Sequence, residues 1–485
     1  MITLLIHPAR RAAAIAGFAA CALLAPAVFA QPYDTPPPPA EPRPLSLAAP
    51  QEQTLPNGLR VVVAQRRGLP LVTAQLLVLS GAEVDPAAKP GLAALSAGLL
   101  TRGSRSRSAP AQAQAAEALG GTLSSSADWH RSTVQMTVTT PRLSAALALM
   151  ADAALRPAFA PAELQRLRAE TLDELNVRYA SPGTQASLVA QRAVFGDGAY
   201  GRPVQGTPAS LSTITQADVQ ALHRTHFRPD NAVLLLAGDV DLAQAVSLAG
   251  RHFGPWKKPT TPLPAREPAL GAPGKDLLTV VDMGAAAGQA SVAVALPVPG
   301  RAAADNAAGA VANAVLGLGY SSRMNQEIRI KRGLSYSAFS SLDARRGGGL
   351  LFAATQTKNE SAAEVLWLVH AQLDSLLQAP VPPDELAARR ATLIGNISRS
   401  VETTVGLAGQ VSALLAAGLP PDALRQRIGA LTAVDAAAVQ RYAQQHFGAD
   451  KRRAVVAGAA AQFEPALRAA VPALVSVPPQ AAATP

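Results

Sequence analysis

The sequence HFRPDNAVLLLAGD, residues 226–239, has a counterpart near the end of the chain, HFGADKRRAVVAG, residues 446–458. Both begin with His-Phe, carry an aspartate before an apolar run, and reach a glycine twelve residues after the histidine. Each follows an amphipathic stretch with an aspartate near its start, residues 216–223 and 435–444, which predicts a helix. The repeat distance is 220 residues, far longer than a solenoid period, so we expect duplication of a whole domain.

Alternating and apolar strand patterns open both halves, and long Ala-rich helical stretches separate them from the closing units. The glycines at 347–349 predict a hairpin turn between two further strands. The expected strands are residues 59–64, 72–79, 277–282 and 290–296, with 337–344 and 350–356 as the hairpin. This order predicts an α+β protein of two α/β-sandwich domains, each with a mixed, largely antiparallel sheet and helices on one face.

Two proline-rich stretches divide the chain, and its length exceeds what a single core supports. The predicted organisation is a signal peptide 1–30, a Pro-rich leader 31–50, an N-terminal domain 51–254, a Pro-rich linker 255–275, a C-terminal domain 276–476 and a disordered tail 477–485.

The N-terminus has the features of an export signal. Arg10 and Arg11 precede an apolar segment, residues 12–27, and small residues stand before Gln31. That segment is short and Ala-rich, so we expect no stable membrane insertion. Cys21, the only cysteine, lies within it, where the sequence fits a lipid-anchor site poorly, and the mature chain has no disulfide. We therefore expect an exported protein of the bacterial periplasm.

The formal net charge of +10 does not indicate nucleic-acid binding, because the basic residues are scattered. The densest basic runs, residues 102–107 and 451–453, are short and lack interleaved aromatic residues. We expect no nucleic-acid partner.

A second stretch, NQEIRIKRGLSYSA at residues 325–338, carries candidate chemistry. It begins like the end of a helix, Gly333 is the expected stop, and residues 334–337 alternate like a strand. Arg329 and Tyr336 then lie on either side of a helix-to-strand turn, where a guanidinium and a phenol could stabilise charge on a substrate oxygen. On local grounds alone, an ordinary capped helix with a half-buried tyrosine explains the same residues.

Both halves resemble the pitrilysin/insulinase (inverzincin) peptidase family from about Leu55 to Phe463. The motifs that carry the resemblance occur in family order: NGLRVVV at 57–63, LPLVTAQLLVLSGA at 69–82, KPGLA at 89–93, AYGRPVQGT at 199–207, FRPDNAVLLLAGDV at 227–240 and SSRMNQEIRIKRGLSYSA at 321–338.

Active members of that family carry H-x-x-E-H on a helix, where the histidines bind zinc and the glutamate activates water. Here the matching positions are Ala94, Ala97 and Gly98, none of which can ligate a metal or take a proton. The family's third ligand matches Glu174, and the acidic position seven residues earlier is Leu167. We therefore expect Glu174 to be a solvated helix residue and the chain to hold no zinc.

The resemblance implies a role for Arg329 and Tyr336. In family members, an Arg and a Tyr at this spacing hold the substrate near its scissile carbonyl, and in some bacterial heterodimers one chain carries zinc and the other the pair. The leading hypothesis is a zinc-less subunit that completes the peptide-binding chamber of a zinc-bearing homologue and binds extended peptides. The alternatives are a structural or peptide-binding homologue without a role in proteolysis, and a peptidase with an unrecognised metal site.

Overall fold

The computed structural model describes residues 47–266 and 269–479. The predicted signal peptide with Cys21, most of the Pro-rich leader and the last six residues of the tail lie outside the described residues. Among the helices within them, none is both long enough and apolar enough to cross a membrane.

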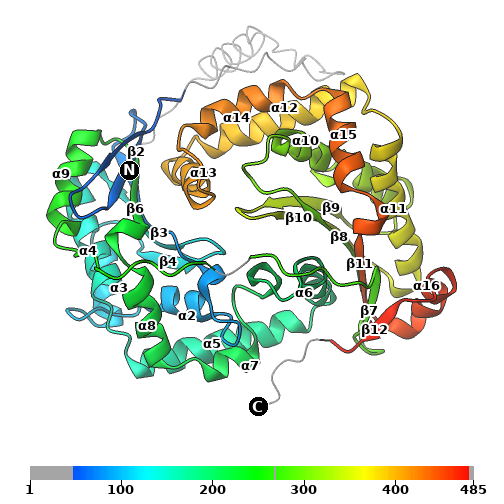
Figure 1. The fold of residues 1–485 in the computed structure, drawn as a ribbon, viewed down its shortest axis with the longest axis horizontal. Helices are drawn as coiled ribbons and strands as arrows, with labels where there is room; N and C mark the ends of the chain where they lie inside the picture. The colour runs from blue at the N-terminus through cyan, green and yellow to red at the C-terminus, as the bar shows by residue number, and fades with distance from the viewer. Residues whose placement is uncertain (1–46, 267–268, 480–485) are drawn as a thin grey trace, which may run out of the picture. The chain divides into compact units, whose positions relative to one another are not determined.

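Two six-stranded sheets repeat one topology (Figure 1). In each, the first long strand pairs in parallel with the returning strand of the closing unit, and the next three strands follow antiparallel. Only the outermost strand differs, because β1 pairs antiparallel with β2 whereas β12 pairs in parallel with β7. The first sheet has the order β1 (Gln51–Thr54), β2 (Arg60–Gln65), β6 (Ala232–Gly238), β3 (Leu71–Val78), β5 (Ser132–Thr139) and β4 (Ser124–Ala127). The second has the order β12 (Val475–Val477), β7 (Leu278–Asp282), β11 (Arg453–Gly458), β8 (Ala290–Val298), β10 (Gly349–Thr357) and β9 (Ala338–Ala344).

Helices pack around each sheet. Those of the first half are α2 (Leu92–Leu99), α3 (Ala109–Glu117), α4 (Leu143–Leu155), α5 (Pro161–Tyr179), α6 (Pro182–Phe195), α7 (Pro208–Thr213), α8 (Gln216–His226) and α9 (Leu242–Phe253). Those of the second are α10 (Asn306–Gly317), α11 (Ala362–Gln378), α12 (Pro383–Ser400), α13 (Thr404–Ala416), α14 (Ala423–Thr432), α15 (Ala436–His446) and α16 (Glu464–Ala470). The predicted two-domain α/β class is confirmed.

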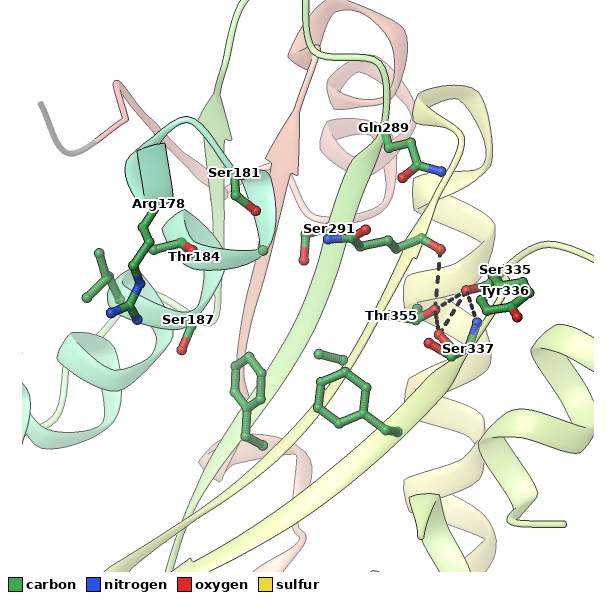
Figure 2. A pocket seen from close by; sticks show the side chains of 16 residues that line it. Arg178, Ser181, Thr184, Ser187, Gln289, Ser291, Ser335, Tyr336, Ser337 and Thr355 are labelled. Atoms are coloured by element: carbon green, nitrogen blue, oxygen red, sulfur yellow. Dashed lines mark hydrogen bonds between the residues drawn. The ribbon is translucent and has the colours of Figure 1, made fainter. Parts of the chain in front are cut away.

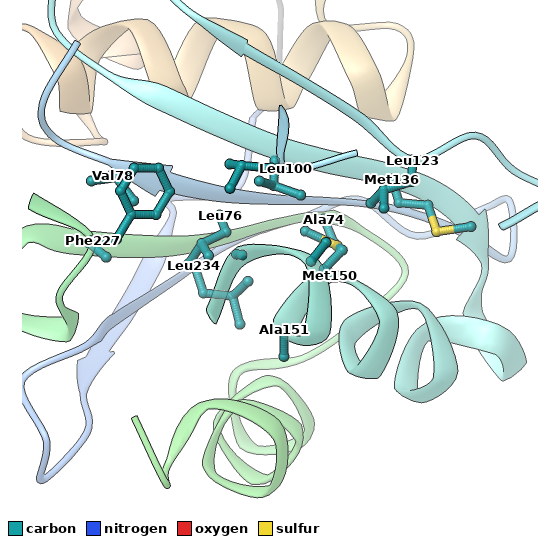
Figure 3. Close-up of a cluster of buried hydrophobic side chains, with 14 of the residues drawn as sticks. Ala74, Leu76, Val78, Leu100, Leu123, Met136, Met150, Ala151, Phe227 and Leu234 are labelled. Atoms are coloured by element: carbon teal, nitrogen blue, oxygen red, sulfur yellow. The ribbon is translucent and has the colours of Figure 1, made fainter. Parts of the chain in front are cut away.

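One hydrophobic core lies between the first sheet and its helices. Alternate residues of β3, among them Leu76 and Val78, point into it with Met136 of β5 and Met150 of α4 (Figure 3). The intervening residues of β3, such as Thr73, face the other side of the sheet because successive side chains of a strand alternate.

The sheets differ from the expected arrangement in one respect, since each carries a helix from the opposite half on its second face. Helix α13 packs on β3 and β6 of the first sheet, and α6 packs on β8 and β11 of the second (Figure 1). The hydroxyls of Thr73 and Thr404 lie 2.8 Å apart at the first contact. At the second, Ala186 and Ala190 meet alanines of β8, and small residues on both sides allow close approach.

The two closing units form as predicted. Asp435 caps α15, its carboxylate accepting the Ala438 amide at 2.6 Å. In α8 the cap is Thr215, and Asp218 is the third helical residue of a reciprocal capping box. The glycine hairpin also forms, with Gly349 of β10 opposite Ala344 of β9.

Candidate functional site

The stretch that carries Arg329 forms a π-helical segment, Asn325–Lys331, anchored by the buried side chain of Ile328. Gly333 closes it with a φ of 65°, a conformation that favours glycine. Its amide donates to the Arg329 carbonyl at 3.0 Å, and the Leu334 amide donates to the Ile328 carbonyl at 2.9 Å. The helical segment therefore ends just before Gly333, as predicted.

The expectation of a strand over residues 334–337 was wrong, since β9 begins at Ala338. Side-chain hydroxyl groups form hydrogen bonds with the backbone amide and carbonyl groups that would otherwise pair with a neighbouring strand. The Ser337 amide donates to Ser335 Oγ at 3.2 Å, and Thr355 Oγ1 donates to the Ser337 carbonyl at 2.8 Å. Serine side chains compete with sheet hydrogen bonds in this way. Tyr336 therefore stands on an irregular turn at the start of the edge strand.

Arg329 differs from the other basic residues of its segment. Lys331 and Arg332 both pair with Glu327, and the guanidinium of Arg323 pairs with another carboxylate at 2.8 Å. Within residues 47–266 and 269–479, the Arg329 guanidinium has neither a carboxylate partner nor a hydrogen bond. The cation is thus available to an external oxygen.

Two exposed tyrosine rings hold this guanidinium in place. Its central carbon lies 4.8 Å from the ring centre of Tyr336 and 5.0 Å from that of Tyr320. A cation over an aromatic face is attracted without using its N–H donors. Tyr336 is 86% exposed, so its phenol is also free to donate. Arg329 and Tyr336 come together as predicted, and the donors of both are accessible.

Tyr320 was missed by the sequence reasoning. It lies nine positions before Arg329, across a turn that follows α10, and no helix or strand period connects the two. Its place against the guanidinium depends on how this turn folds back, which no local spacing encodes.

Tyr336 stands at the rim of a pocket of about 630 Å³. Residues from α6, β8, β9 and β10 line it, and Figure 2 shows Thr184 and Ser187 of α6 opposite the Ser335–Ser337 turn. The pocket joins an element of the first half to the sheet of the second.

The positions that match H-x-x-E-H, Ala94, Ala97 and Gly98, lie on α2. A Cβ built on Gly98 would lie 2.9 Å from Leu167 Cδ2, so this leucine of α5 occupies the space beside the second histidine position. The Ala97 carbonyl accepts a hydrogen bond from Ser125 Oγ at 2.6 Å. Packing and local hydrogen bonds fill this part of the helix.

Glu174 is exposed on α5, one of the helices that packs against α2. The neighbouring carboxylate of Glu170 pairs with Arg102 at 2.5 Å. The described residues contain no group of three or more His, Cys, Asp or Glu side chains placed to hold a metal ion.

Asp85 holds the N-terminus of α2. Its carboxylate accepts the amides of Gly91 at 2.9 Å and Ala93 at 2.8 Å. Burial raises the pKa of Asp85 to about 7, although these two amide hydrogen bonds act in the opposite direction. The helix that bears Ala94, Ala97 and Gly98 is therefore fixed from its first turn.

A partly buried polar network joins the two halves at the turn between β9 and β10. Glu83 accepts from His130 Nδ1 at 2.8 Å and from Arg346 Nη1 at 2.9 Å, and Arg266 Nε lies 3.1 Å from it. His130 Nε2 lies 3.1 Å from the Tyr200 hydroxyl. Burial raises the pKa of Glu83, but the hydrogen bond from His130 and the charge of Arg346 outweigh it and the pKa is lowered.

Comparisons with known proteins agree with this architecture. Residues 60–207 match the model of the insulinase family, peptidase family M16, and residues 213–393 match that of the peptidase M16 inactive domain. An uncharacterized zinc protease of Mycobacterium bovis is 30% identical over 363 residues, which cover 74% of this chain and 82% of that protein.

Solved structures match over most of the chain. A peptidase M16 inactive domain from Pseudomonas fluorescens superposes with a TM-score of 0.78 at 25% identity, covering 84% of this chain and 98% of that one. The periplasmic protease PqqL from Escherichia coli has the same fold, with a TM-score of 0.72 at 18% identity over 85% of this chain and 46% of its own. The duplicated sandwich and the family matches to both halves show that the chain belongs to the insulinase family of peptidases, peptidase family M16.

Proposed function

We propose that this protein is the zinc-less subunit of an exported metalloendopeptidase and completes the peptide-binding site of a zinc-bearing homologue. The observation that carries the proposal is Arg329, a cation that has no carboxylate partner in the described part of the chain and lies between two exposed tyrosine rings at the rim of a pocket. A second observation supports it, since Leu167 fills the space beside Gly98 in the family's zinc helix.

The chain's own residues have a defined task in this proposal. The Arg329 guanidinium and the Tyr336 hydroxyl donate to the oxygen of the scissile carbonyl, which gains negative charge as the tetrahedral intermediate forms. The contact with the Tyr320 ring holds the Arg329 guanidinium beside Tyr336, so the guanidinium needs to move little when substrate binds. Zinc bound by the partner supplies the activated water. This chain stabilises charge and positions the peptide, and the partner supplies the nucleophile.

We place the complex in the bacterial periplasm. The proposal rests on the signal-like first thirty residues of the sequence, and the fold shared with a periplasmic protease of Escherichia coli is consistent with it.

The test is to produce this chain together with a homologue that carries H-x-x-E-H and to measure cleavage of a quenched fluorescent peptide. We expect Arg329→Ala and Tyr336→Phe to lower kcat by ~10²–10³ each while the complex still forms, because one oxyanion donor is worth that much. Arg332→Ala is the matched control, since Arg332 lies three residues from Arg329 but is neutralised by Glu327. We expect it to change the rate less than about threefold, consistent with a surface ion pair.

Unchanged cleavage by the Arg329→Ala and Tyr336→Phe complexes would refute the proposal. It would favour the structural or peptide-binding homologue. Chelator-sensitive cleavage by the isolated chain, with stoichiometric zinc, would refute both.

A further inference from the structure

On the face that α6 covers, the second sheet becomes exposed towards its β9 edge, where Phe339, Ser341 and Asp343 are accessible. Helix α6 packs on β8 and β11, where its side chains meet residues such as Ala295. Phe352 of β10 is directly opposite Ala295, and Phe339 of β9 is directly opposite Ala354. Residues opposite one another on adjacent strands point to the same face, so both phenylalanines lie on the α6 side. Phe339 is 47% exposed, beyond the reach of the helix.

These phenylalanines form the floor of the pocket beside Tyr336, which we call the aromatic subsite. Thr184 and Ser187 of α6 form its facing wall (Figure 2). Leu188 of the same helix also lines the pocket. Its volume of about 630 Å³ is typical of ligand sites that combine apolar walls with a few polar groups.

The aromatic subsite carries a positive charge and no negative charge among the described residues that line it. Among the described residues that line it, none is an aspartate or glutamate, and Arg178 is the only one with a formal charge. A lysine or arginine side chain would lose water there without gaining a carboxylate. An aromatic side chain would instead stack on phenylalanine rings and keep the hydroxyls of the wall within reach.

A second pocket of about 650 Å³ continues from the first, and the two share Ser181, Gln289 and Gln356. The side-chain amides of Gln289 and Gln356 form no hydrogen bond within the described part of the chain. An amide offers both donors and an acceptor, which suits a peptide backbone passing between the pockets. Gly183 leaves room for this passage, since a Cβ there would lie 3.1 Å from Gln356 Nε2.

We propose that the aromatic subsite binds a bulky aromatic side chain of an extended peptide and selects against lysine and arginine at that position. The inference rests on the proposed function, because the bound peptide is the one whose carbonyl Arg329 and Tyr336 hold. Tyr336 lines the rim of the same pocket, so the residue selected is close in sequence to the scissile bond.

Peptide binding to the isolated full chain tests this selection without a partner. The probes are three fluorescently labelled peptides of glycine and serine that carry a central Phe, Ala or Lys, and the readout is fluorescence anisotropy. We expect the Phe peptide to bind roughly 10-fold tighter than the Ala peptide, since stacking and burial of one ring add to the affinity. We expect the Lys peptide to bind more weakly than both.

Phe339→Ser and Phe352→Ser are expected to remove most of the Phe preference. Phe339 is half exposed on an edge strand, so its variant tests the subsite even if Phe352→Ser folds poorly. The matched control is Trp367→Ser. This aromatic residue is 39% exposed on α11, which packs on the other face of the sheet, and its loss should leave the preference unchanged.

Equal affinity for the three peptides, or an unchanged Phe preference in both phenylalanine variants, would overturn the inference. This failure differs from failure of the proposed function. If the Arg329→Ala complex loses activity as expected but the isolated chain shows no preference for the Phe peptide, only the aromatic subsite is refuted. A Phe preference combined with unaffected proteolysis in that complex supports the subsite and overturns the subunit role.

Discussion

Replacing Arg346 by alanine should weaken the connection between the two halves. Its guanidinium donates to Glu83 at 2.9 Å and twice to the Ala416 carbonyl, at 3.1 and 2.6 Å. Removing one partner of a buried ion pair typically costs about 3–5 kcal/mol. Here Glu83 keeps His130 and Arg266, so we expect the lower end, about 3 kcal/mol in the free energy of unfolding.

The loss should depend on pH. The pKa of Glu83 is lowered from its ordinary 4.5, with Arg346 among the causes, so its stabilising contribution is present above about pH 4.5 and disappears as the pH falls. The difference between the wild type and Arg346→Ala should therefore be largest near neutral pH and shrink towards pH 3.

Urea unfolding followed by circular dichroism, at neutral and acidic pH, measures this difference. Arg332→Ala is the control, because the ion pairs of that arginine with Glu327 and Glu364 lie at the surface and its loss should cost less than about 1 kcal/mol. Hydrogen exchange should localise the effect to the β9–β10 hairpin and the end of α13. A loss below about 1 kcal/mol, or one independent of pH, would refute the reasoning, since it would mean that the network carries no net stabilising charge interaction.

Three further predictions concern α2 and its surroundings. Burial raises the pKa of Asp85 from 3.8 to about 7, so its contribution to stability is present at low pH and is lost as the pH rises between those two values. We therefore expect the Tm of Asp85→Asn to fall less from pH 4 to pH 7 than the Tm of the wild type. Parallel curves of Tm against pH would contradict this. Gly91→Ala should cost about 2 kcal/mol or more in urea unfolding, because Gly91 has a φ of 95° and a Cβ would lie 2.8 Å from backbone, whereas Gly284→Ala, with positive φ but open space, should cost about 1 kcal/mol. A variant with the three side chains of H-x-x-E-H restored should bind little zinc in metal analysis, because Leu167 fills the space beside position 98. Adding Leu167→Ala to that variant should raise its zinc content. Equal zinc in the two variants would contradict the packing argument.

Local features of the fold follow directly from the sequence. The predicted strand over residues 59–64 forms as Arg60–Gln65, and the glycine stop at Gly333 and the cap at Asp435 lie where expected. Strand periodicity, helix caps and positive-φ glycines each depend on a few adjacent residues, so a single sequence is sufficient to read them.

The strand expected over residues 334–337 shows where such reading fails. The alternation of Leu334 to Ser337 is real, but Thr355 of the neighbouring strand and Ser335 engage the backbone instead. A hydroxyl from 18 residues away outweighs the local pattern, since strand propensity is set largely by tertiary context.

The repeated closing units and strand patterns were enough to predict the duplication and the α/β class. The family resemblance located Ala94, Ala97 and Gly98 at the positions of H-x-x-E-H, and the identity of these side chains already excludes metal binding by them, wherever they lie. Two features could be seen only in the folded chain: α6 and α13 cover the sheet of the opposite half, and Tyr320 joins Tyr336 around Arg329, which has no carboxylate partner among the described residues. These arrangements bring together segments with no common period, and only the burial and pairing available to the whole chain select them.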